Sequence, residues 1–318
     1  MENKKINLIG KKALVTGAAG FIGSHLVRRL LEEGAQVAVI VRKSTKLWKL
    51  NDIKNHISIC YGDIQDKDSL EKIISSYKPE YVFHLAAYGV NSQNKDYYKA
   101  IRTNIVGSVN IMELLSKTGS EKIINIGSSS EYGLINGPQT EDGVLNPLNI
   151  YGSTKAAATI IMHQIARTND QNIVTIRPFG LFGEREEQHK IFSFIITSIL
   201  KGQEVKLTSC QQFRDYIYVE NLVDAMILAC KSGIKNEIFN IGSGKVEKLE
   251  YYVNKIFELT KSDLKPKYGY YTQREGDMWC PCPNVDKIKT LLQWDIKISF
   301  EKGLNKTINW FEKNLEYY

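Results

Sequence analysis

The stretch Thr16-Gly17-Ala18-Ala19-Gly20-Phe21-Ile22-Gly23 lies between an apolar run, Ala13-Leu14-Val15, and a helical pattern of apolar residues. Glycines at such a turn let the backbone approach a pyrophosphate, whose negative charge is then stabilised by the N-terminus of the helix. The three glycines are a variant of the GxGxxG pattern, and a plain turn is the alternative interpretation. Because the stretch lies directly between a predicted strand and a predicted helix, we predict that it binds a dinucleotide.

Apolar runs alternate with helical patterns through the first half of the chain. The runs predict strands at Ala13–Thr16, Val37–Val41, Ile57–Tyr61, Tyr81–Leu85, Ile123–Ile126 and Ile173–Arg177. The helical patterns lie near residues 22–33, 68–77, 97–117 and 151–168. Strands that are apolar throughout and separated by helices are typical of a parallel sheet that is buried on both faces. We therefore predict an α/β fold with a doubly wound parallel (Rossmann) sheet.

The alternation loosens after Pro178, and a smaller unit is expected there. The pattern predicts a helix around residues 190–201 and strands at Val205–Leu207 and Glu237–Ile241. We expect residues 1–180 to form the dinucleotide-binding domain, with residues 215–244 returning to it. Residues 181–214 and 245–318 should form a C-terminal substrate-binding lid over the carboxyl ends of the strands, where such sheets bind ligands.

The bulk properties exclude several classes of protein. The chain has 318 residues and a formal net charge of +7, but its lysines are spread out, which argues against a nucleic-acid partner. Met1 to Lys5 contain no apolar signal core, and the apolar run Ile191 to Leu200 is too short to cross a bilayer. The five cysteines are irregularly spaced, and Cys280-Pro281-Cys282 has no second ligand pair. We expect a cytoplasmic protein with no membrane partner and no metal.

A second informative stretch is Tyr151-Gly152-Ser153-Thr154-Lys155. It places a phenol and an ammonium four residues apart, on one face of a predicted helix. A cation so near a tyrosine favours the phenolate and lowers a pKa that is normally about 10. We therefore predict that Tyr151 transfers a proton beside a bound dinucleotide, which indicates an oxidoreductase.

Residues that follow the predicted strands are candidates for binding the dinucleotide. The second strand ends in Arg42 and Lys43 with no carboxylate, and Arg42 suits a 2′-phosphate, so NADP is favoured over NAD. The alternative is that Arg42 is a surface charge and the protein uses NAD. Asp63, followed by Ile64, can accept a hydrogen bond from the adenine amine, or it can cap a turn or helix. The residues Leu85, Ala86 and Ala87 suit close approach of a nicotinamide ribose.

The run Gly127-Ser128-Ser129-Ser130-Glu131-Tyr132-Gly133 follows the strand at Ile123–Ile126. Its hydroxyls should therefore emerge at the carboxyl edge of the sheet, where one serine can hydrogen-bond a substrate carbonyl. A loop of capping serines is the alternative. The run does not match GxSxG, so the nucleophile of a hydrolase is a poor fit.

With these residues, the chain resembles the extended short-chain dehydrogenase/reductase family, which includes nucleotide-sugar epimerases, dehydratases and ketoreductases. The resemblance runs nearly end to end. It is carried by Thr16–Gly23, Gly62-Asp63, His84–Ala87, Asn104, Ser128–Gly133, Tyr151 with Lys155, Arg177-Pro178-Phe179, Arg214–Val219, Arg274–Asp277 and Leu291–Trp294. It implies that the cofactor is held by Gly17, Gly20, Phe21, Ile22, Gly23, Arg42, Asp63, Ile64, Leu85, Ala86, Ala87, Tyr151, Lys155 and Pro178.

The resemblance also implies the catalytic roles. Tyr151 is expected to exchange a proton with a sugar hydroxyl or ketone, and Lys155 to lower its pKa and hold the nicotinamide ribose. Ser128, four residues before Tyr132, occupies the position of the catalytic Ser or Thr. Asn104 resembles the asparagine that kinks a helix to support the active site.

For the substrate, the resemblance implies a nucleotide-diphosphate sugar. Arg214 and Arg274 look like the pair that clamps the diphosphate, a use suited to forked guanidinium donors, and surface ion pairs are the alternative. Ser128 and Ser129 are expected at the sugar, together with Tyr88 at the border of the pocket.

The chain departs from the family pattern after Ser128. The 4,6-dehydratases carry an Asp-Glu pair directly after the catalytic Thr, whereas this chain has Ser129 and Ser130, and Glu131 falls one residue late. Dehydration therefore lacks its usual acid and base. Many members also have Asn where this chain has Gly180, which puts one substrate contact in doubt.

These observations favour an NAD(P)-dependent 4-ketoreductase or 4-dehydrogenase of a nucleotide-activated (deoxy)sugar. The alternatives are a 4-epimerase with tightly bound NAD, then a 4,6-dehydratase or a non-catalytic dinucleotide-binding regulator. By resemblance we also expect a homodimer through helices 97–117 and 151–168, where Ile105, Val109, Ile161 and Ile165 recur at helical spacing.

Overall fold

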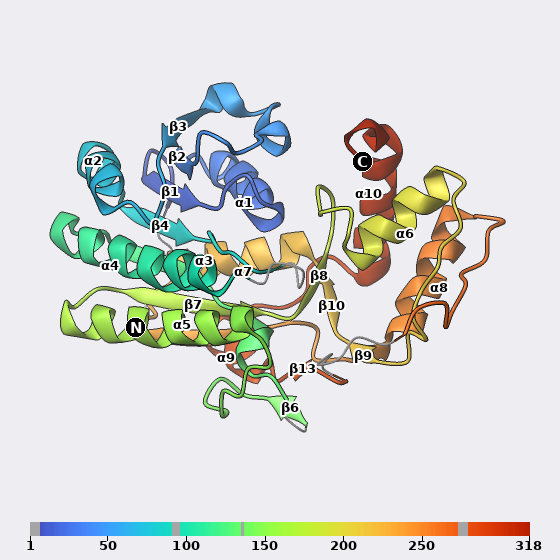
Figure 1. Cartoon of the computed structure of the whole chain (residues 1–318). Helices are drawn as coiled ribbons and strands as arrows, with labels where there is room; N and C mark the ends of the chain where they lie inside the picture. The colour runs from blue at the N-terminus through green and yellow to red at the C-terminus, as the bar shows by residue number, and fades with distance from the viewer. Residues whose placement is uncertain (1–6, 91–95, 135–136, 273–278) are drawn as a thin grey trace.

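Seven parallel strands form the central sheet of the computed structural model, which describes residues 7–90, 96–134, 137–272 and 279–318 (Figure 1). Across the sheet, the strands are β11 (Glu237–Ile241), β7 (Ile173–Pro178), β5 (Lys122–Ile126), β4 (Tyr81–His84), β1 (Lys12–Thr16), β2 (Gln36–Val41) and β3 (Ile57–Tyr61). Every neighbouring pair is parallel. The predicted doubly wound parallel sheet is confirmed.

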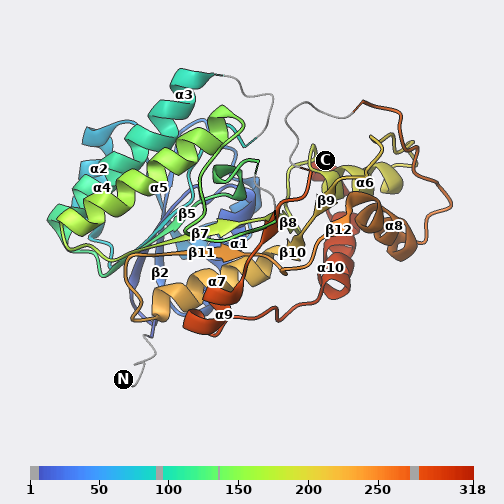
Figure 2. The ribbon, with the colours of Figure 1, turned by 90° about the horizontal axis from the view of Figure 1, so that it is seen from below.

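Helices cover both faces of this sheet, as Figure 2 shows. One face carries α2 (Lys67–Tyr77), α4 (Gly107–Thr118) and α5 (Ile150–Thr168). The other carries α1 (Phe21–Glu32), α7 (Val219–Lys231) and α9 (Asp286–Leu292). Parallel strands need crossover connections, which these helices provide. Each helix returns the chain to the same end of the sheet, so the carboxyl ends of all the strands lie together along one edge.

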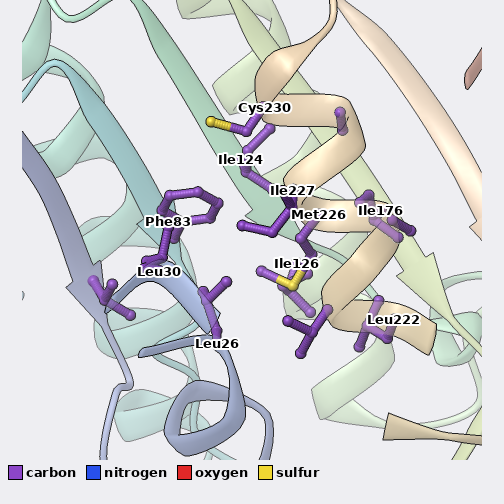
Figure 3. Close-up of a cluster of buried hydrophobic side chains, with 14 of the residues drawn as sticks. Leu26, Leu30, Phe83, Ile124, Ile126, Ile176, Leu222, Met226, Ile227 and Cys230 are labelled. Atoms are coloured by element: carbon purple, nitrogen blue, oxygen red, sulfur yellow. The ribbon is translucent and has the colours of Figure 1, made fainter. Parts of the chain in front are cut away.

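The core between the sheet and the helices α1 and α7 holds the start of α1 in place (Figure 3). None of its labelled side chains is more than 6% exposed. Burying a large apolar side chain contributes about 1.5–3 kcal/mol, so this packing anchors α1, the helix that begins within the glycine stretch. The labelled residues are Leu26, Leu30, Phe83, Ile124, Ile126, Ile176, Leu222, Met226, Ile227 and Cys230.

A second, smaller cluster of helices lies to one side of the sheet (Figures 1 and 2). It consists of α6 (Ile191–Leu200), α8 (Leu249–Thr260) and α10 (Phe300–Lys313), around a core that is rich in buried aromatic rings. Short strand pairs connect it to the rest of the chain: β8 (Gly180–Phe182) with β10 (Tyr216–Tyr218), β9 (Phe213–Arg214) with β12 (Glu247–Lys248), and β6 (Pro138–Gln139) with β13 (Cys282–Pro283).

The predicted strand at Val205–Leu207 is wrong. Only Lys206 forms an isolated bridge, with Lys267. Gly269 in the neighbouring segment has a φ of +73°, outside the β region, and the pairing of the two segments is limited to this one bridge. The run is apolar because Val205 and Leu207 are buried in the cluster of α6 and α8, and burial in a loop gives the same signal as a strand.

None of the helices in the described ranges is long and apolar enough to span a bilayer. Within the same ranges, no group of three or more His, Cys, Asp or Glu side chains could hold a metal ion. All five cysteines are free.

Candidate active site

One cavity of about 1090 Å³ lies at the carboxyl ends of the central strands. Residues that follow β1, β2, β3, β4, β5 and β7 line it, together with the start of α6. The predicted site residues that it brings together are Gly17, Gly20, Phe21, Ile22, Gly23, Arg42, Asp63, Ile64, Leu85, Ala86, Ala87, Tyr88, Ser128, Ser129, Tyr151, Lys155 and Pro178. Residues far apart in the sequence therefore meet at one site, as strand ends in a doubly wound fold must.

The glycine stretch builds a cradle at one end of this cavity. Gly17 has a φ of +70°, and a Cβ on it would lie 2.7 Å from the backbone nitrogen of Ala86. A Cβ on Gly23 would lie 2.2 Å from the carbonyl oxygen of Gly17. Helix α1 begins at Gly20 with no side-chain cap, so its first N–H groups face the cradle. This donor set fits the diphosphate of a dinucleotide.

Tyr151 and Lys155 lie one turn apart on α5, whose first turn is capped by Asn149 through a 2.9 Å hydrogen bond from the Gly152 N–H. The side chain of Ser128, at the end of β5, is hydrogen-bonded to Tyr151. The Lys155 ammonium donates a 2.5 Å hydrogen bond to the carbonyl oxygen of Ile126. All three side chains therefore meet at the cavity wall.

The pKa of Tyr151 departs from the sequence prediction. Burial raises it to about 12, an effect that the charge of Glu131 reinforces and the hydrogen bond from Ser128 opposes. Lys155 does not lower the pKa of Tyr151, because its ammonium is bound by Ile126 rather than by the phenol. The predicted acidic phenol is thus wrong for this structure. A phenol with this pKa keeps its proton at neutral pH and can donate it.

Asn104 lies behind the cavity rather than in its lining. Its side-chain oxygen accepts a 2.7 Å hydrogen bond from the Tyr88 N–H, and its amide donates to the Tyr88 carbonyl and to Thr154 Oγ1. The predicted helix 97–117 is present as α3 (Tyr97–Ile101), a π-helical turn at Arg102–Val106 and α4. The π-helical turn contains Asn104, the residue expected to kink this helix, and Asn104 connects Tyr88 in the cavity wall to α5.

Two candidate cofactor contacts lie at the far end of the cavity. Arg42 is exposed at the end of β2. Asp63 also lines the cavity, and one of its carboxylate oxygens accepts a 3.0 Å hydrogen bond from the Gln65 N–H. The helix that follows is capped by Asp66, so Asp63 does not cap a helix, but its hydrogen bond from the Gln65 N–H caps a turn, as the alternative interpretation expected.

Of the predicted pair of arginines, only Arg214 lies within the described residues. Arg214, on β9, is not among the residues that line the cavity, and its guanidinium donates a 2.6 Å hydrogen bond to the Phe213 carbonyl. Arg274 lies outside the described residues. The diphosphate clamp stays a prediction.

The sequence reasoning missed the segment that leads into α6. Glu186, His189 and Lys190 line the cavity, and Lys190 is the N-cap residue of α6. Burial raises the pKa of Glu186 to about 8. The signal in the sequence was the basic pair His189-Lys190 directly before the apolar run of α6, because cationic side chains and the free N–H groups of a helix N-terminus both attract anionic ligands.

Glu131 points away from the cavity. It is wholly buried and pairs with Arg177 at 2.8 Å, whereas Ser129 and Ser130 line the cavity where an acid–base pair for dehydration would be needed. The carboxylates that do line the cavity within the described ranges are Asp63, Glu186 and Glu187.

Comparisons with known proteins agree with this geometry. A family model for the NAD dependent epimerase/dehydratase family matches residues 13–242. The UDP-glucuronate 4-epimerase of Thermodesulfobacterium geofontis is 30% identical over 95% of this chain and 97% of its own length.

Two solved structures have the same fold over nearly the whole chain. The UDP-glucose 4-epimerase of Thermotoga maritima, solved with UDP-glucose, is 31% identical with a TM-score of 0.89, covering 96% of this chain and 99% of that one. The dTDP-glucose 4,6-dehydratase of Bacillus anthracis, solved with NAD, is 26% identical with a TM-score of 0.88, covering 97% and 99%.

Proposed function

The chain belongs to the NAD dependent epimerase/dehydratase family, and from that premise we propose that it catalyses hydride transfer at C4 of a nucleotide-activated (deoxy)sugar, as a 4-ketoreductase or 4-dehydrogenase. Its relatives act on nucleotide sugars, as the names UDP-glucuronate 4-epimerase and dTDP-glucose 4,6-dehydratase state. The observation that carries the proposal is the meeting of Ser128, Tyr151 and Lys155 with the glycine cradle in one cavity.

The geometry supports a proton transfer that accompanies hydride transfer. A bound nicotinamide dinucleotide supplies the hydride for reduction and accepts it for oxidation. When a C4 carbonyl carbon gains hydride, Tyr151 donates its proton to the carbonyl oxygen, which becomes a hydroxyl. Ser128 hydrogen-bonds Tyr151 and orients the same oxygen. With its pKa raised to about 12, Tyr151 carries its proton at neutral pH, which is the protonation state that donation to a carbonyl oxygen requires.

Dehydration fits the chain less well. Elimination of water needs an acid and a base beside the sugar, and the two positions after Ser128 carry hydroxyls. Glu131 does not replace them, because its carboxylate is buried against Arg177 behind the cavity.

A 4-epimerase is the second candidate, and the comparisons favour it. The structure from Thermotoga maritima and the relative from Thermodesulfobacterium geofontis are both named 4-epimerases, and the former is 31% identical to this chain. Epimerisation uses the same Ser128, Tyr151 and Lys155, but it retains the cofactor through an oxidation and a reduction. An epimerase therefore shows no net redox change.

One assay separates the two candidates. Purified protein is incubated with NADPH or NADH and a set of 4-keto-6-deoxy nucleotide sugars, and absorbance is followed at about 340 nm, where the reduced nicotinamide absorbs. We expect a loss of absorbance with at least one sugar. Tightly bound NAD with interconversion of C4 epimers and no change in absorbance would instead assign the epimerase reaction. Absence of both reactions would contradict the proposal.

For the cofactor, we propose a preference for NADP through Arg42. The support is the end of β2, where Arg42 lines the cavity and no carboxylate is present; the structural neighbour from Bacillus anthracis was solved with NAD. Arg42→Ala should weaken NADPH binding about 10- to 100-fold, because one charge-assisted hydrogen bond to a phosphate is lost, and leave NADH binding nearly unchanged. Fluorescence titration measures both affinities.

The neighbouring Lys43 provides the matched control. It is exposed and does not line the cavity, so Lys43→Ala removes the same charge without a contact to the cofactor. Equal effects of the two variants, or a loss of NADH binding equal to that of NADPH binding, would contradict the assignment of Arg42.

We also propose a homodimer through α4 and α5. These helices pack side by side on one face of the sheet (Figure 2), and Ile105 in the π-helical turn before α4, Val109 on α4, and Ile161 and Ile165 on α5 are only partly buried. Val106, in the same π-helical turn, and Ile160, on α5, are exposed, at 41% and 57%. Ile160→Lys should place a charge in that interface and shift the protein from twice the chain mass to the chain mass in sedimentation experiments.

Leu291→Lys is the control for this prediction. Leu291 is 46% exposed on α9, on the opposite face of the sheet, so the same charge is added away from α5. A monomeric wild-type protein would refute the proposed dimer.

A further inference from the structure

Glu131 makes three hydrogen bonds behind the candidate active site. One carboxylate oxygen, Oε1, accepts from the Ser128 N–H at 2.8 Å and from Thr159 Oγ1 at 3.3 Å. The other, Oε2, accepts from Arg177 Nε at 2.8 Å. Since these partners all donate, a carboxylate satisfies them, whereas the NH₂ group of a glutamine would face a donor whichever way it turned.

Arg177 is itself fixed from several sides. Its guanidinium donates to Tyr132 Oη at 2.9 Å and to the Glu141 carbonyl at 3.2 Å, and it lies 4.8 Å from the Tyr132 ring centroid. Tyr132 in turn donates to Asn240 on β11 at 2.7 Å. The ion pair thus joins the ends of β5, β7 and β11, and it is 0–2% exposed.

Gly127 leaves the space that the ion pair needs. A Cβ at this position would lie 2.6 Å from Glu131 Oε1 and 2.9 Å from Arg177 Cγ. The backbone between β5 and Ser128 is therefore packed directly against the pair, so a shift of the carboxylate would move the residues that carry the Ser128 hydroxyl.

Glu131 also connects the two elements that carry the catalytic side chains. The turn Ser129–Glu131 is closed by a reciprocal cap, in which Ser128 Oγ accepts from the Ser130 N–H at 3.1 Å and Glu131 accepts from the Ser128 N–H. On α5, Thr159 follows Lys155 by four residues, as Lys155 follows Tyr151, so these three share one helix face. Glu131 therefore accepts hydrogen bonds both from Ser128 itself and from Thr159, which lies on the helix that carries Tyr151.

We propose that Glu131, held by Arg177, is a positioning residue that fixes the Ser128 turn against α5 and so keeps the Ser128 hydroxyl on Tyr151. The inference rests on the proposed C4 reaction, because it assigns Glu131 a part in the same proton transfer. Glu131 is not in the cavity lining and acts through Ser128 and Tyr151 alone.

The charge of Glu131 predicts a change in the pH dependence of the rate, which a purely structural role of this residue would not produce. Burial raises the pKa of Tyr151 and lowers that of Lys155; the negative charge of Glu131 adds to the first shift and opposes the second. The other charged and titratable groups at this junction are Arg177 on β7, Tyr132 and Glu141 in the segment after β5, and Lys155 and His163 on α5. Removing the negative charge lowers the pKa of Tyr151. Since reduction requires the protonated phenol, the alkaline limb of its rate profile moves to lower pH.

The test is Glu131→Gln in the full chain, assayed in the direction of reduction. We expect kcat to fall about 10- to 100-fold, the effect of losing one charge-assisted hydrogen bond, with the KM for dinucleotide nearly unchanged. We also expect the alkaline limb, which the pKa of about 12 places above the usual assay range in the wild type, to begin at a lower pH in the variant. Glu33→Gln, which breaks the pair with Lys231 at the end of α1, is the control and should alter neither quantity.

A folded Glu131→Gln protein with the wild-type kcat, or with a lower kcat and an unmoved pH profile, would overturn the proposal. If this variant does not fold, Thr159→Val removes only the bond to α5; a fall in kcat of about 2- to 10-fold is then expected, and an unchanged kcat would overturn the proposal. Failure of the proposed C4 reaction is distinguishable, because the wild-type protein itself would then show no turnover.

Discussion

Tyr151→Phe should lower kcat by about 10²- to 10⁴-fold, the contribution of a positioned general acid, while dinucleotide affinity stays near that of the wild type. The phenyl ring keeps the packing of α5, and only the hydroxyl that is hydrogen-bonded to Ser128 is removed. Because the pKa of Tyr151 is raised to about 12, the wild-type residue carries its proton throughout the usual assay range, so the loss should be similar at each pH. Steady-state kinetics of reduction measure kcat, and fluorescence titration measures affinity.

Tyr251→Phe is the matched control, because Tyr251 lies on α8, outside the cavity lining, with its ring packed against Tyr252. It should retain the wild-type kcat. A Tyr151→Phe enzyme within about tenfold of wild-type kcat would show that another group donates the proton, since a loss that small is below the range for general acid catalysis.

Much of the fold was predictable because the apolar runs that indicate buried strands are visible in short stretches of the sequence. Strands such as β1, β2 and β5 are buried on both faces and read as unbroken apolar runs, and their order with the helices implies the parallel sheet. The run Val205–Leu207 shows the limit of that signal. Val205 and Leu207 are buried, but Lys206 between them is only partly buried and forms a single bridge, with Lys267, so the run packs as a loop against α6 and α8. Hydrophobicity reports burial, and pairing depends on a distant segment.

The candidate site was predictable in its members and not in its electrostatics. The spacing of Tyr151 and Lys155 places both on one helix face, but the Lys155 ammonium is bound by Ile126, on a strand that the spacing does not describe. The sequence likewise shows that Glu131 falls one residue late. Whether its side chain faces the cavity depends on Arg177, 46 residues away, because the hydrogen bond from Arg177 holds the Glu131 carboxylate in the interior of the protein. Such tertiary partners set pKa values and side-chain directions.

The helix expected at residues 97–117 is present, with a π-helical turn at Arg102–Val106 where Asn104 bonds both backbone groups of Tyr88. The family resemblance, and not the local pattern, indicated Asn104 as the residue that kinks this helix. Insertions of this kind occur often at functional sites, because one extra residue in a turn redirects a side chain. The spacing of apolar residues in this segment does not indicate the contact between Asn104 and Tyr88.

Gly17→Ala should abolish useful dinucleotide binding and destabilise the fold. The φ of +70° is unfavourable for alanine, and the new Cβ would lie 2.7 Å from Ala86 N and from the carbonyl carbon of Leu85, which are backbone atoms that cannot rotate away. The ends of β1 and β4 must therefore separate, which moves the cradle. We expect a loss of about 2–5 kcal/mol in the free energy of unfolding, from strain plus overpacking, and affinity weakened about 100-fold or more.

Gly10→Ala separates these two causes. Gly10 has nearly the same φ, +72°, but a Cβ there would meet nothing within 4 Å. This variant should lose only the conformational part, about 1–2 kcal/mol, and bind the dinucleotide as the wild type does. Denaturant unfolding and fluorescence titration of both variants measure the two quantities. Equal stability losses in the pair, with binding retained in Gly17→Ala, would show that the close approach of β1 to β4 does not shape the cofactor site.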